Sequence, residues 1–225
     1  MPSLDNDIHP TAVVSRGARL GRDNVIGPFV VISAAVTLGD GNWIGAHSNL
    51  GAPPEIRGFD HGGNARDERA EFGLIIGSDN VLRESVNITS GSHKDTSVGH
   101  GTFIMNQAYV AHDCVIGDDV TIASSVTLAG HCTVGRGANL GLGVAAHQFT
   151  TIGAYAMVGM SSVVTREVPP FAVAFGAPAM VRKVNRVGME RNGFSPADIA
   201  WVTEWTEKGF GDVESAPERV RRYLG

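Results

Sequence analysis

A histidine followed directly by an aspartate is the strongest candidate for chemistry in this sequence. The pair is His112 and Asp113. A neighbouring carboxylate can fix the tautomer of an imidazole and raise its basicity, which prepares the histidine to act as a general base. Two further histidines follow later in the chain, His131 and His147, the second with Gln148 beside it. These residue types predict proton-transfer chemistry if the fold brings them together.

A six-residue repeat supplies the elements that would position these residues. Counting in sixes from Ile8, every position through Leu50 is aliphatic. The register returns from Val98 to Val164, where only Ala146 is smaller than a large aliphatic residue. Glycine often follows the aliphatic position, and a small or β-branched residue stands four places after it. This pattern is typical of a hexapeptide-repeat parallel β-helix, an all-β solenoid in which each coil covers the apolar face of the next.

The length of a coil places the candidate residues on one strip. Three six-residue units form a coil, so residues three units apart stack in neighbouring coils about 4.8 Å apart. Gly130 then stacks on His112, and His131 stacks on Asp113. A glycine at this point exposes a backbone N–H that could stabilise an oxyanion. Because His147 lies close to two coils from His112, three histidines, a carboxylate and a bare amide converge.

The same stacking explains the two cysteines. Cys114 and Cys132 both take the small inward position, one coil apart, so we expect buried thiols that pack as small apolar groups. Zinc on the histidine strip is the rival interpretation, because hexapeptide carbonic anhydrases bind zinc through histidines on this fold. Those proteins carry two histidines five residues apart, and this sequence has no such pair. We therefore expect no metal.

The repeat is interrupted twice and then ends. The breaks at about 52–73 and 89–97 predict loops thrown out of the β-helix, and loops of this kind often gather on the binding face of a solenoid. Consecutive prolines at 169–170 predict the end of strand pairing. We expect the β-helix with its loops to occupy residues 1–184 and a short α-helical tail to occupy 185–225.

The tail carries its own helix signals. Ser195 to Asp198 forms a capping box with proline at the first helical position, which predicts a helix to about Lys208. A second short helix is predicted from Ser215 to Leu224. So short a helical segment cannot bury a core alone, so we expect it to pack on the β-helix or on a neighbouring subunit.

Composition excludes several classes of protein. The 225 residues carry a net charge of −5, so the chain lacks the basic field of a nucleic-acid-binding protein. No apolar run approaches the roughly 18 residues that a membrane span needs, and the acidic, polar start is no secretory signal. We expect a cytoplasmic protein with no integral membrane segment.

Several short segments carry a more specific resemblance than the repeat does. They are Arg83–Val86, Val110–Gly117, Leu128–His131, Ala146–Phe149, Val168–Phe171 and Gly188–Ser195. Together they resemble the acyl-carrier-protein–UDP-N-acetylglucosamine O-acyltransferases, which catalyse the first step of lipid A synthesis. The resemblance covers about residues 8–200, and it implies that the β-helix is left-handed.

The resemblance also implies roles for individual residues. His112 would be the general base toward a sugar hydroxyl, Asp113 would orient it, and the Gly130 N–H would stabilise the tetrahedral oxyanion. The other matching positions contact substrate in the family. His131, His147 and Gln148 would hold the sugar and the acyl chain, and Glu55 and Arg57 would contact the substrate from the first loop. Asn185 and Arg191 would contact the nucleotide phosphate, and Met160 would meet the end of the acyl chain.

Substrates and partners follow from the same resemblance. An acyl group, a 3-hydroxyacyl chain in the family, would pass from the phosphopantetheine of acyl carrier protein to a UDP-linked amino sugar, with no separate cofactor. A bulky Met160, where glycine leaves the acyl groove open, implies a medium chain. The family's sites lie between the subunits of a homotrimer. Arg182, Lys183, Arg186 and Arg191 would offer a basic surface to the acidic carrier protein.

Three departures from the family pattern keep other activities open. Tyr109 replaces the family's second histidine, Thr89 replaces a histidine after the Arg-Glu-Ser motif, and Asn192 replaces one of two paired arginines. This pattern fits a paralogue that keeps the acyl-transfer chemistry and changes its acceptor or donor. Transfer to the UDP-linked amino sugar could be O- or N-acylation. The alternatives are an acyl-CoA-dependent acyltransferase on a different nucleotide-linked sugar and a non-catalytic trimeric scaffold.

Overall fold

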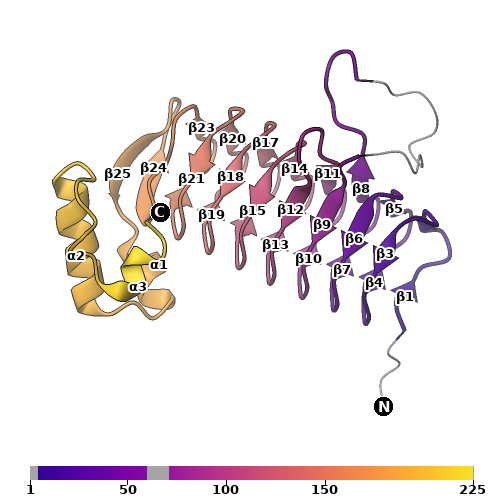
Figure 1. Cartoon of the computed structure of the whole chain (residues 1–225), viewed down its shortest axis with the longest axis horizontal. Coiled ribbons are helices and arrows are strands. Elements are labelled where there is room, and N and C mark those ends of the chain that lie inside the picture. Colours follow the sequence, from indigo (N-terminus) through magenta and orange to yellow (C-terminus); the bar gives the residue numbers. More distant parts are fainter. Residues whose placement is uncertain (1–4, 60–70, 225) are drawn as a thin grey trace.

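The chain forms the parallel β-helix that the repeat predicts (Figure 1). The computed structural model describes residues 5–59 and 71–224. Most six-residue units contribute one short strand, and each strand pairs in parallel with the equivalent strand of the next coil. Three sheets run the length of the stack as its three faces.

The sheets differ mainly in how far they extend along the stack. The ten-stranded sheet contains β1 (Asp7–Ile8), β4 (Val25–Ile26), β7 (Trp43–Ile44), β10 (Val81–Leu82), β13 (Phe103–Ile104), β16 (Thr121–Ile122), β19 (Asn139–Leu140), β22 (Met157–Val158), β24 (Ala172–Phe175) and β25 (Met180–Val184). The eight-stranded sheet contains β2 (Val13–Val14), β5 (Val31–Ile32), β8 (Asn49–Ala52), β11 (Asn87–Thr89), β14 (Tyr109–Val110), β17 (Thr127–Leu128), β20 (Ala145–Ala146) and β23 (Val163–Val164). The seven-stranded sheet contains β3 (Arg19–Leu20), β6 (Val36–Leu38), β9 (Leu74–Ile76), β12 (Thr96–Val98), β15 (Val115–Ile116), β18 (Thr133–Val134) and β21 (Thr151–Ile152).

The aliphatic residue of each unit fills the interior of the stack. Ile32, Ile44 and Leu50 are completely buried, as are their counterparts along most of the chain. Ile8 stays 39% exposed because, within the described residues, no coil precedes its own. Burial therefore depends on the neighbouring coil, at about 0.8 kcal/mol for each buried methylene. Cys114 and Cys132 are buried and unbridged in this interior, as expected.

The two inserted loops change the spacing between stacked residues. Hydrogen-bonded residues in neighbouring coils are 18 positions apart where the repeat is unbroken. The separation rises to 38 between Asn42 and Asn80 and to 22 between Asn80 and Thr102. The first loop leaves after β8 and returns at β9, and the second joins β11 to β12. Residues 60–70 of the first expected loop lie outside the described residues.

A ladder of buried side-chain amides crosses the coils at one inward position. The Nδ2 of Asn24 donates to Asn6 Oδ1, that of Asn42 to Asn24 Oδ1, and that of Asn80 to Asn42 Oδ1, at 2.9–3.0 Å. The backbone N–H of each donor residue binds the same oxygen. Thr102 closes the ladder through its hydroxyl and its backbone N–H. This ladder replaces the small apolar residue of the repeat with a fully satisfied polar chain.

Strand pairing continues past the consecutive prolines, which corrects the expectation that it ends there. Pro169 and Pro170 lie in the turn before β24, where a missing backbone N–H breaks no ladder hydrogen bond. β24 then pairs in parallel with β22, and β25 turns back antiparallel to β24.

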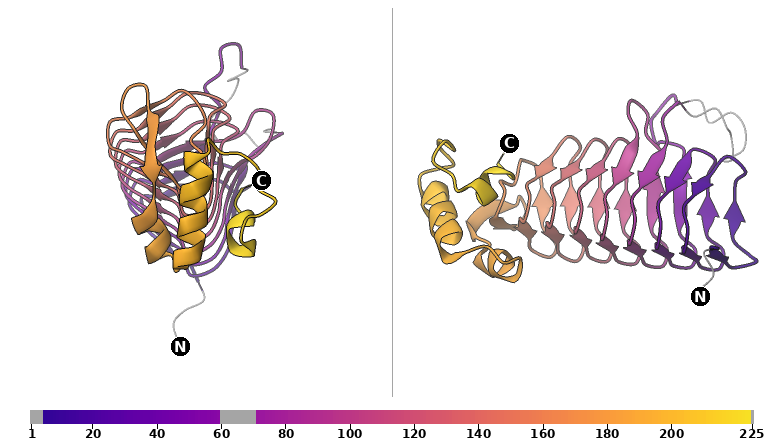
Figure 2. Two further views of the ribbon diagram at one scale, coloured as in Figure 1. Left: turned by 90° about the vertical axis from the view of Figure 1, so that its left-hand side faces the viewer. Right: turned by 60° about the horizontal axis from the view of Figure 1, so that its bottom comes forward.

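The helical tail covers the C-terminal end of the solenoid (Figure 2). It consists of α1 (Arg186–Arg191), α2 (Pro196–Glu207) and α3 (Glu218–Arg221), the last shorter than predicted. The expected capping box at Ser195 opens α2, and Val202 is completely buried on its inner face. Phe194 and Tyr223 contact the ring of Tyr155, which belongs to the β-helix. The tail therefore packs on the β-helix of its own chain.

Candidate active site

The catalytic candidates occupy equivalent corners of neighbouring coils. Asp113 and His131 both have a left-handed backbone with φ of 62°, and Phe149 on the following coil has φ of 63°. The corner is therefore a repeated backbone conformation that aspartate and histidine tolerate better than most residues. The strands before these corners, β14 and β17, are in register, with Val110 opposite Leu128. The expected stacking of His131 on Asp113 is confirmed.

The carboxylate of Asp113 lies at the centre of the site and is completely buried. Its Oδ1 accepts hydrogen bonds from the backbone N–H groups of Ser92, His93 and Lys94, at 2.8–2.9 Å. Its Oδ2 accepts from the Ser92 hydroxyl and from His112 Nδ1, both at 2.6 Å. The second inserted loop thus wraps the carboxylate in donors, an arrangement that stabilises a buried negative charge.

These hydrogen bonds determine the charge of the site. Burial acts to raise the pKa of Asp113, but the bonds from Ser92, His112 and the loop backbone outweigh it and hold the pKa well below its ordinary range. Asp113 is therefore a carboxylate at neutral pH. Burial lowers the pKa of His131, against the opposing pull of Asp113.

His112 is held in one tautomer and faces a bare backbone. His112 Nδ1–H donates a hydrogen bond to the Asp113 carboxylate, which leaves the lone pair of Nε2 available. Only 14% of the His112 side chain is exposed. A Cβ built on Gly130 would lie 2.6 Å from His112 Cε1 and 2.7 Å from Nε2, so glycine alone fits against the ring. Among the described residues, the Gly130 N–H has no hydrogen-bond acceptor, so it is free to bind an oxyanion.

His131 completes the cluster from the next coil. Its Nε2 lies 3.5 Å from Asp113 Oδ2, and its ring meets that of His112 edge-on at 5.2 Å. Phe149 stacks on its other side, with ring centroids 4.4 Å apart and planes 8° from parallel. The arrangement can abstract a proton at His112, stabilise a negative oxygen at Gly130 and bind a polar substrate group at His131.

The chain is similar to known acyltransferases over most of its length. Residues 167–215 match the model of the second domain of UDP-N-acetylglucosamine O-acyltransferases, and residues 95–130 match that of bacterial transferase hexapeptides. The acyl-[acyl-carrier-protein]–UDP-N-acetylglucosamine O-acyltransferase of Verminephrobacter eiseniae is 39% identical over 212 residues, covering 88% of this chain and 81% of that protein. The enzyme of the same name from Thiobacillus denitrificans is 41% identical, covering 84% and 78%. The chain belongs to this O-acyltransferase family.

Solved structures agree with this membership. The UDP-N-acetylglucosamine acyltransferase of Campylobacter jejuni superimposes with a TM-score of 0.80 at 26% identity, covering 96% of this chain and 94% of that one. The Arabidopsis UDP-N-acetylglucosamine acyltransferase gives 0.75 at 28% identity, covering 95% and 87%. The expected fold is thus confirmed, and this member of the O-acyltransferase family is an enzyme.

The first loop of this O-acyltransferase is tied to the coil of His112. The hydroxyl of Tyr109, on β14, donates to Glu55 Oε2 at 2.7 Å. Burial and the Glu55 carboxylate together raise the pKa of Tyr109, so the phenol stays protonated and the contact persists. Tyr109 therefore fixes the position of Glu55, a residue expected to contact substrate. Arg57 is exposed further along the same loop.

The remaining expected residues lie farther along the stack. His147 and Gln148 are exposed on the turn that also carries Phe149, which links them to His131. Met160 is 69% exposed on the turn after β22. His147 and Gln148 extend the strip from His112 toward the C-terminal end, whereas Met160, between β22 and β23, lies at a different corner of the β-helix.

Asn185, the N-cap of α1, and Arg191, its last residue, belong to the helical end of the chain, apart from the strands that carry the cluster (Figure 1). Asn185 caps α1, where its Oδ1 accepts from the Gly188 N–H and its Nδ2 donates to the Tyr155 carbonyl. Arg191 is exposed in the last turn of α1. Within one chain, neither residue shares a site with His112.

Sequence reasoning missed how the second loop supports the dyad of His112 and Asp113. The stretch 89–97 was expected to matter for binding, but nothing in its residue types singled out Ser92 or the three backbone N–H groups. Thr96 was missed as well, although its hydroxyl accepts the N–H of Asp113 at 2.9 Å. The one available signal is that this loop interrupts the repeat one coil before His112.

Proposed function

We propose that the chain transfers an acyl group from acyl carrier protein to a hydroxyl of a UDP-linked amino sugar of the UDP-N-acetylglucosamine type, as its relatives are named to do. That reaction is the first step of lipid A synthesis. The supporting observation is the His112–Asp113 hydrogen bond of 2.6 Å with Gly130 packed against the same imidazole. A general base and an oxyanion donor then flank one point, as acyl transfer requires.

The reaction divides among these residues as follows. His112 Nε2 takes the proton of the sugar hydroxyl as the oxygen attacks the thioester carbonyl, and Asp113 stabilises the imidazolium that forms. The Gly130 N–H stabilises the negative oxygen of the tetrahedral intermediate. The C–S bond then breaks, and the imidazolium returns its proton to the leaving phosphopantetheine thiolate. The new C–O bond is the ester bond between the acyl group and the sugar.

The proposal extends to the partners and the assembly. Tyr109 holds Glu55 above the coil of His112, where it could bind the sugar. Arg182, Lys183, Arg186 and Arg191 are all exposed, which suits contact with an acidic carrier protein. The helix α1, which Asn185 caps and Arg191 ends, lies away from the strands that flank His112 in one chain, so these two residues would reach a nucleotide only at a site shared between the subunits of a homotrimer.

The test is acyl transfer by the purified protein and a His112→Ala variant. The substrates are acyl carrier proteins loaded with 3-hydroxyacyl chains of several lengths, with UDP-N-acetylglucosamine, and the product is identified by mass spectrometry. Removing the base should lower kcat by about 10²–10⁴. His9→Ala, an exposed histidine of the first coil, is the matched control. Product from coenzyme A thioesters alone, or equal rates for His112→Ala and the parent protein, would contradict the proposal.

Within the described residues, no helix is long and apolar enough to cross a membrane.

A further inference from the structure

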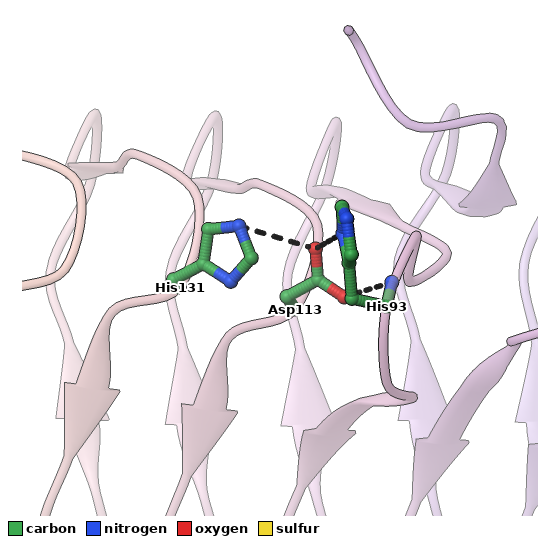
Figure 3. A group of neighbouring side chains, drawn as sticks. All are labelled: His93, Asp113 and His131. Carbon is green, nitrogen blue, oxygen red and sulfur yellow. Dashed lines mark hydrogen bonds and ion pairs between the residues drawn. The ribbon is translucent and has the colours of Figure 1, made fainter. Parts of the chain in front are cut away.

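Three potential metal ligands, His93, Asp113 and His131, lie close together beside His112 (Figure 3 draws the three ligands). His93 comes from the second inserted loop, Asp113 from the corner after β14, and His131 from the corner after β17. One ligand atom of each lies within 4.8 Å of the other two. The linear spacing of the histidines predicted no metal site. Stacking of the coils, however, brings together residues that are far apart in the sequence.

The distances suit a small tetrahedral ion. Zinc binds imidazole nitrogen and carboxylate oxygen at about 2.0–2.2 Å, which puts two ligand atoms about 3.3–3.6 Å apart in a tetrahedron. His131 Nε2 is already 3.5 Å from Asp113 Oδ2, and His93 Nδ1 is 3.8 Å from the same oxygen. His93 Nδ1 now shares a hydrogen bond of 2.8 Å with the Ser92 hydroxyl, which zinc would displace, and the side chain is 76% exposed, so it has room to close the remaining gap.

The surroundings orient two of the three ligands. Three backbone N–H groups on Oδ1 fix the Asp113 carboxylate and leave Oδ2 facing the histidines. Phe149 stacks on His131 and holds the plane of its ring. Such support of ligands from outside the coordination shell commonly strengthens a metal site by about 10- to 100-fold. Two imidazoles with one carboxylate, and an open fourth position, select zinc over magnesium or calcium.

We propose that His93, Asp113 and His131 bind a zinc ion, and that zinc inhibits the enzyme by drawing Asp113 Oδ2 away from His112. The same oxygen now accepts hydrogen bonds from His112 Nδ1 and from Ser92. A cation on that oxygen competes with both donors, so the hydrogen bond that orients the His112 ring is weakened or lost. The inhibitory half of this inference rests on the proposed acyl transfer, whereas the binding half does not.

The binding half is tested by calorimetry and by spectroscopy on the full chain. Zn²⁺ titrated into metal-free protein should bind with one ion per chain, and Co²⁺ should give the visible absorption of a tetrahedral site. Mg²⁺ should give neither signal. His93→Gln should weaken Zn²⁺ binding at least tenfold, whereas His9→Gln, which changes an exposed histidine of the first coil, should not. Absence of stoichiometric binding, or an unchanged Kd in His93→Gln, overturns the inference.

The inhibitory half is tested by measuring acyl transfer in the presence of zinc and in the presence of EDTA. The ratio of the two rates is compared between the parent protein and His93→Gln. Zinc should lower the rate of the parent protein at least tenfold, and His93→Gln should need at least tenfold more zinc for the same ratio. Stoichiometric binding without a change in rate overturns the inhibitory role. A protein that binds zinc and transfers no acyl group contradicts the proposed function, while an active protein that binds no zinc contradicts only this inference.

Discussion

Gly130→Ala should disable the dyad without removing any group that takes part in the reaction. The added Cβ would lie 2.6 Å from His112 Cε1 and 2.7 Å from Nε2. Ordinary van der Waals contacts between such atoms are about 3.5–4.0 Å, so the ring or the backbone must move by roughly 1 Å. The Gly130 backbone lies outside the positive-φ region, so alanine is allowed there, and the backbone N–H is retained.

The expected cost follows from that displacement. Moving the imidazole stretches its 2.6 Å hydrogen bond to Asp113 and turns Nε2 away from the hydroxyl that it must deprotonate. Displacements of about 1 Å in a catalytic group cost on the order of 10²-fold in rate. We expect kcat to fall by about 10²-fold.

The assay is the transfer reaction described above, with the melting temperature measured on the same preparations. Gly211→Ala is the control, because a Cβ there meets nothing within 4 Å. If Gly130→Ala keeps its rate within about threefold of the parent and remains folded, the packing of Gly130 on His112 has no bearing on catalysis and the reasoning is wrong.

Three other perturbations address the neighbouring residues. Asp113→Asn should lower kcat by about 10²–10⁴, because the amide cannot hold the same tautomer. Folding holds the pKa of Asp113 below its unfolded value of about 3.9, so the ionised carboxylate stabilises the folded protein fully above that pH and progressively less below it. The difference in melting temperature between the parent protein and Asp113→Asn should therefore shrink between pH 7 and pH 3. An unchanged difference would refute this. Tyr109→Phe frees Glu55 and should raise KM for the sugar several-fold with little change in kcat, and an unaltered KM would argue against the contact. Met160→Gly should raise kcat/KM for longer acyl chains by about tenfold relative to the chain that the parent protein prefers. If both proteins rank the acyl chain lengths in the same order, Met160 does not determine chain length.

The repeat made much of this structure predictable, because a solenoid converts sequence separation into position. Once the six-residue period was found, Gly130 had to stack on His112 and His131 on Asp113. The capping box at Ser195 was predictable for a similar reason, since it depends only on residues three positions apart.

The features that the sequence did not predict depend on contacts that the six-residue repeat does not place. Ser92 lies in a loop, and its hydrogen bond to Asp113 spans 21 positions outside the repeat. The consecutive prolines gave the wrong boundary because their effect depends on whether they fall in a strand or in a turn, and they fall in the turn before Phe171. The approach of His93 to Asp113 likewise depends on the path of the second loop.

The asparagine ladder explains how the chain can vary its loops without losing alignment of its coils. Asn42 and Asn80 remain partners although the first loop separates them by 38 positions, and Thr102 joins across the second. A slip of one unit would place aliphatic side chains against these amides, and each buried amide without a partner costs about 1–3 kcal/mol. Folds in which the coils pair out of register are thus destabilised by residues that lie outside the loops. Insertion, deletion and exchange of sequence in the first loop can therefore change the contacts of that loop while the coils keep their register and His131 stays stacked on Asp113.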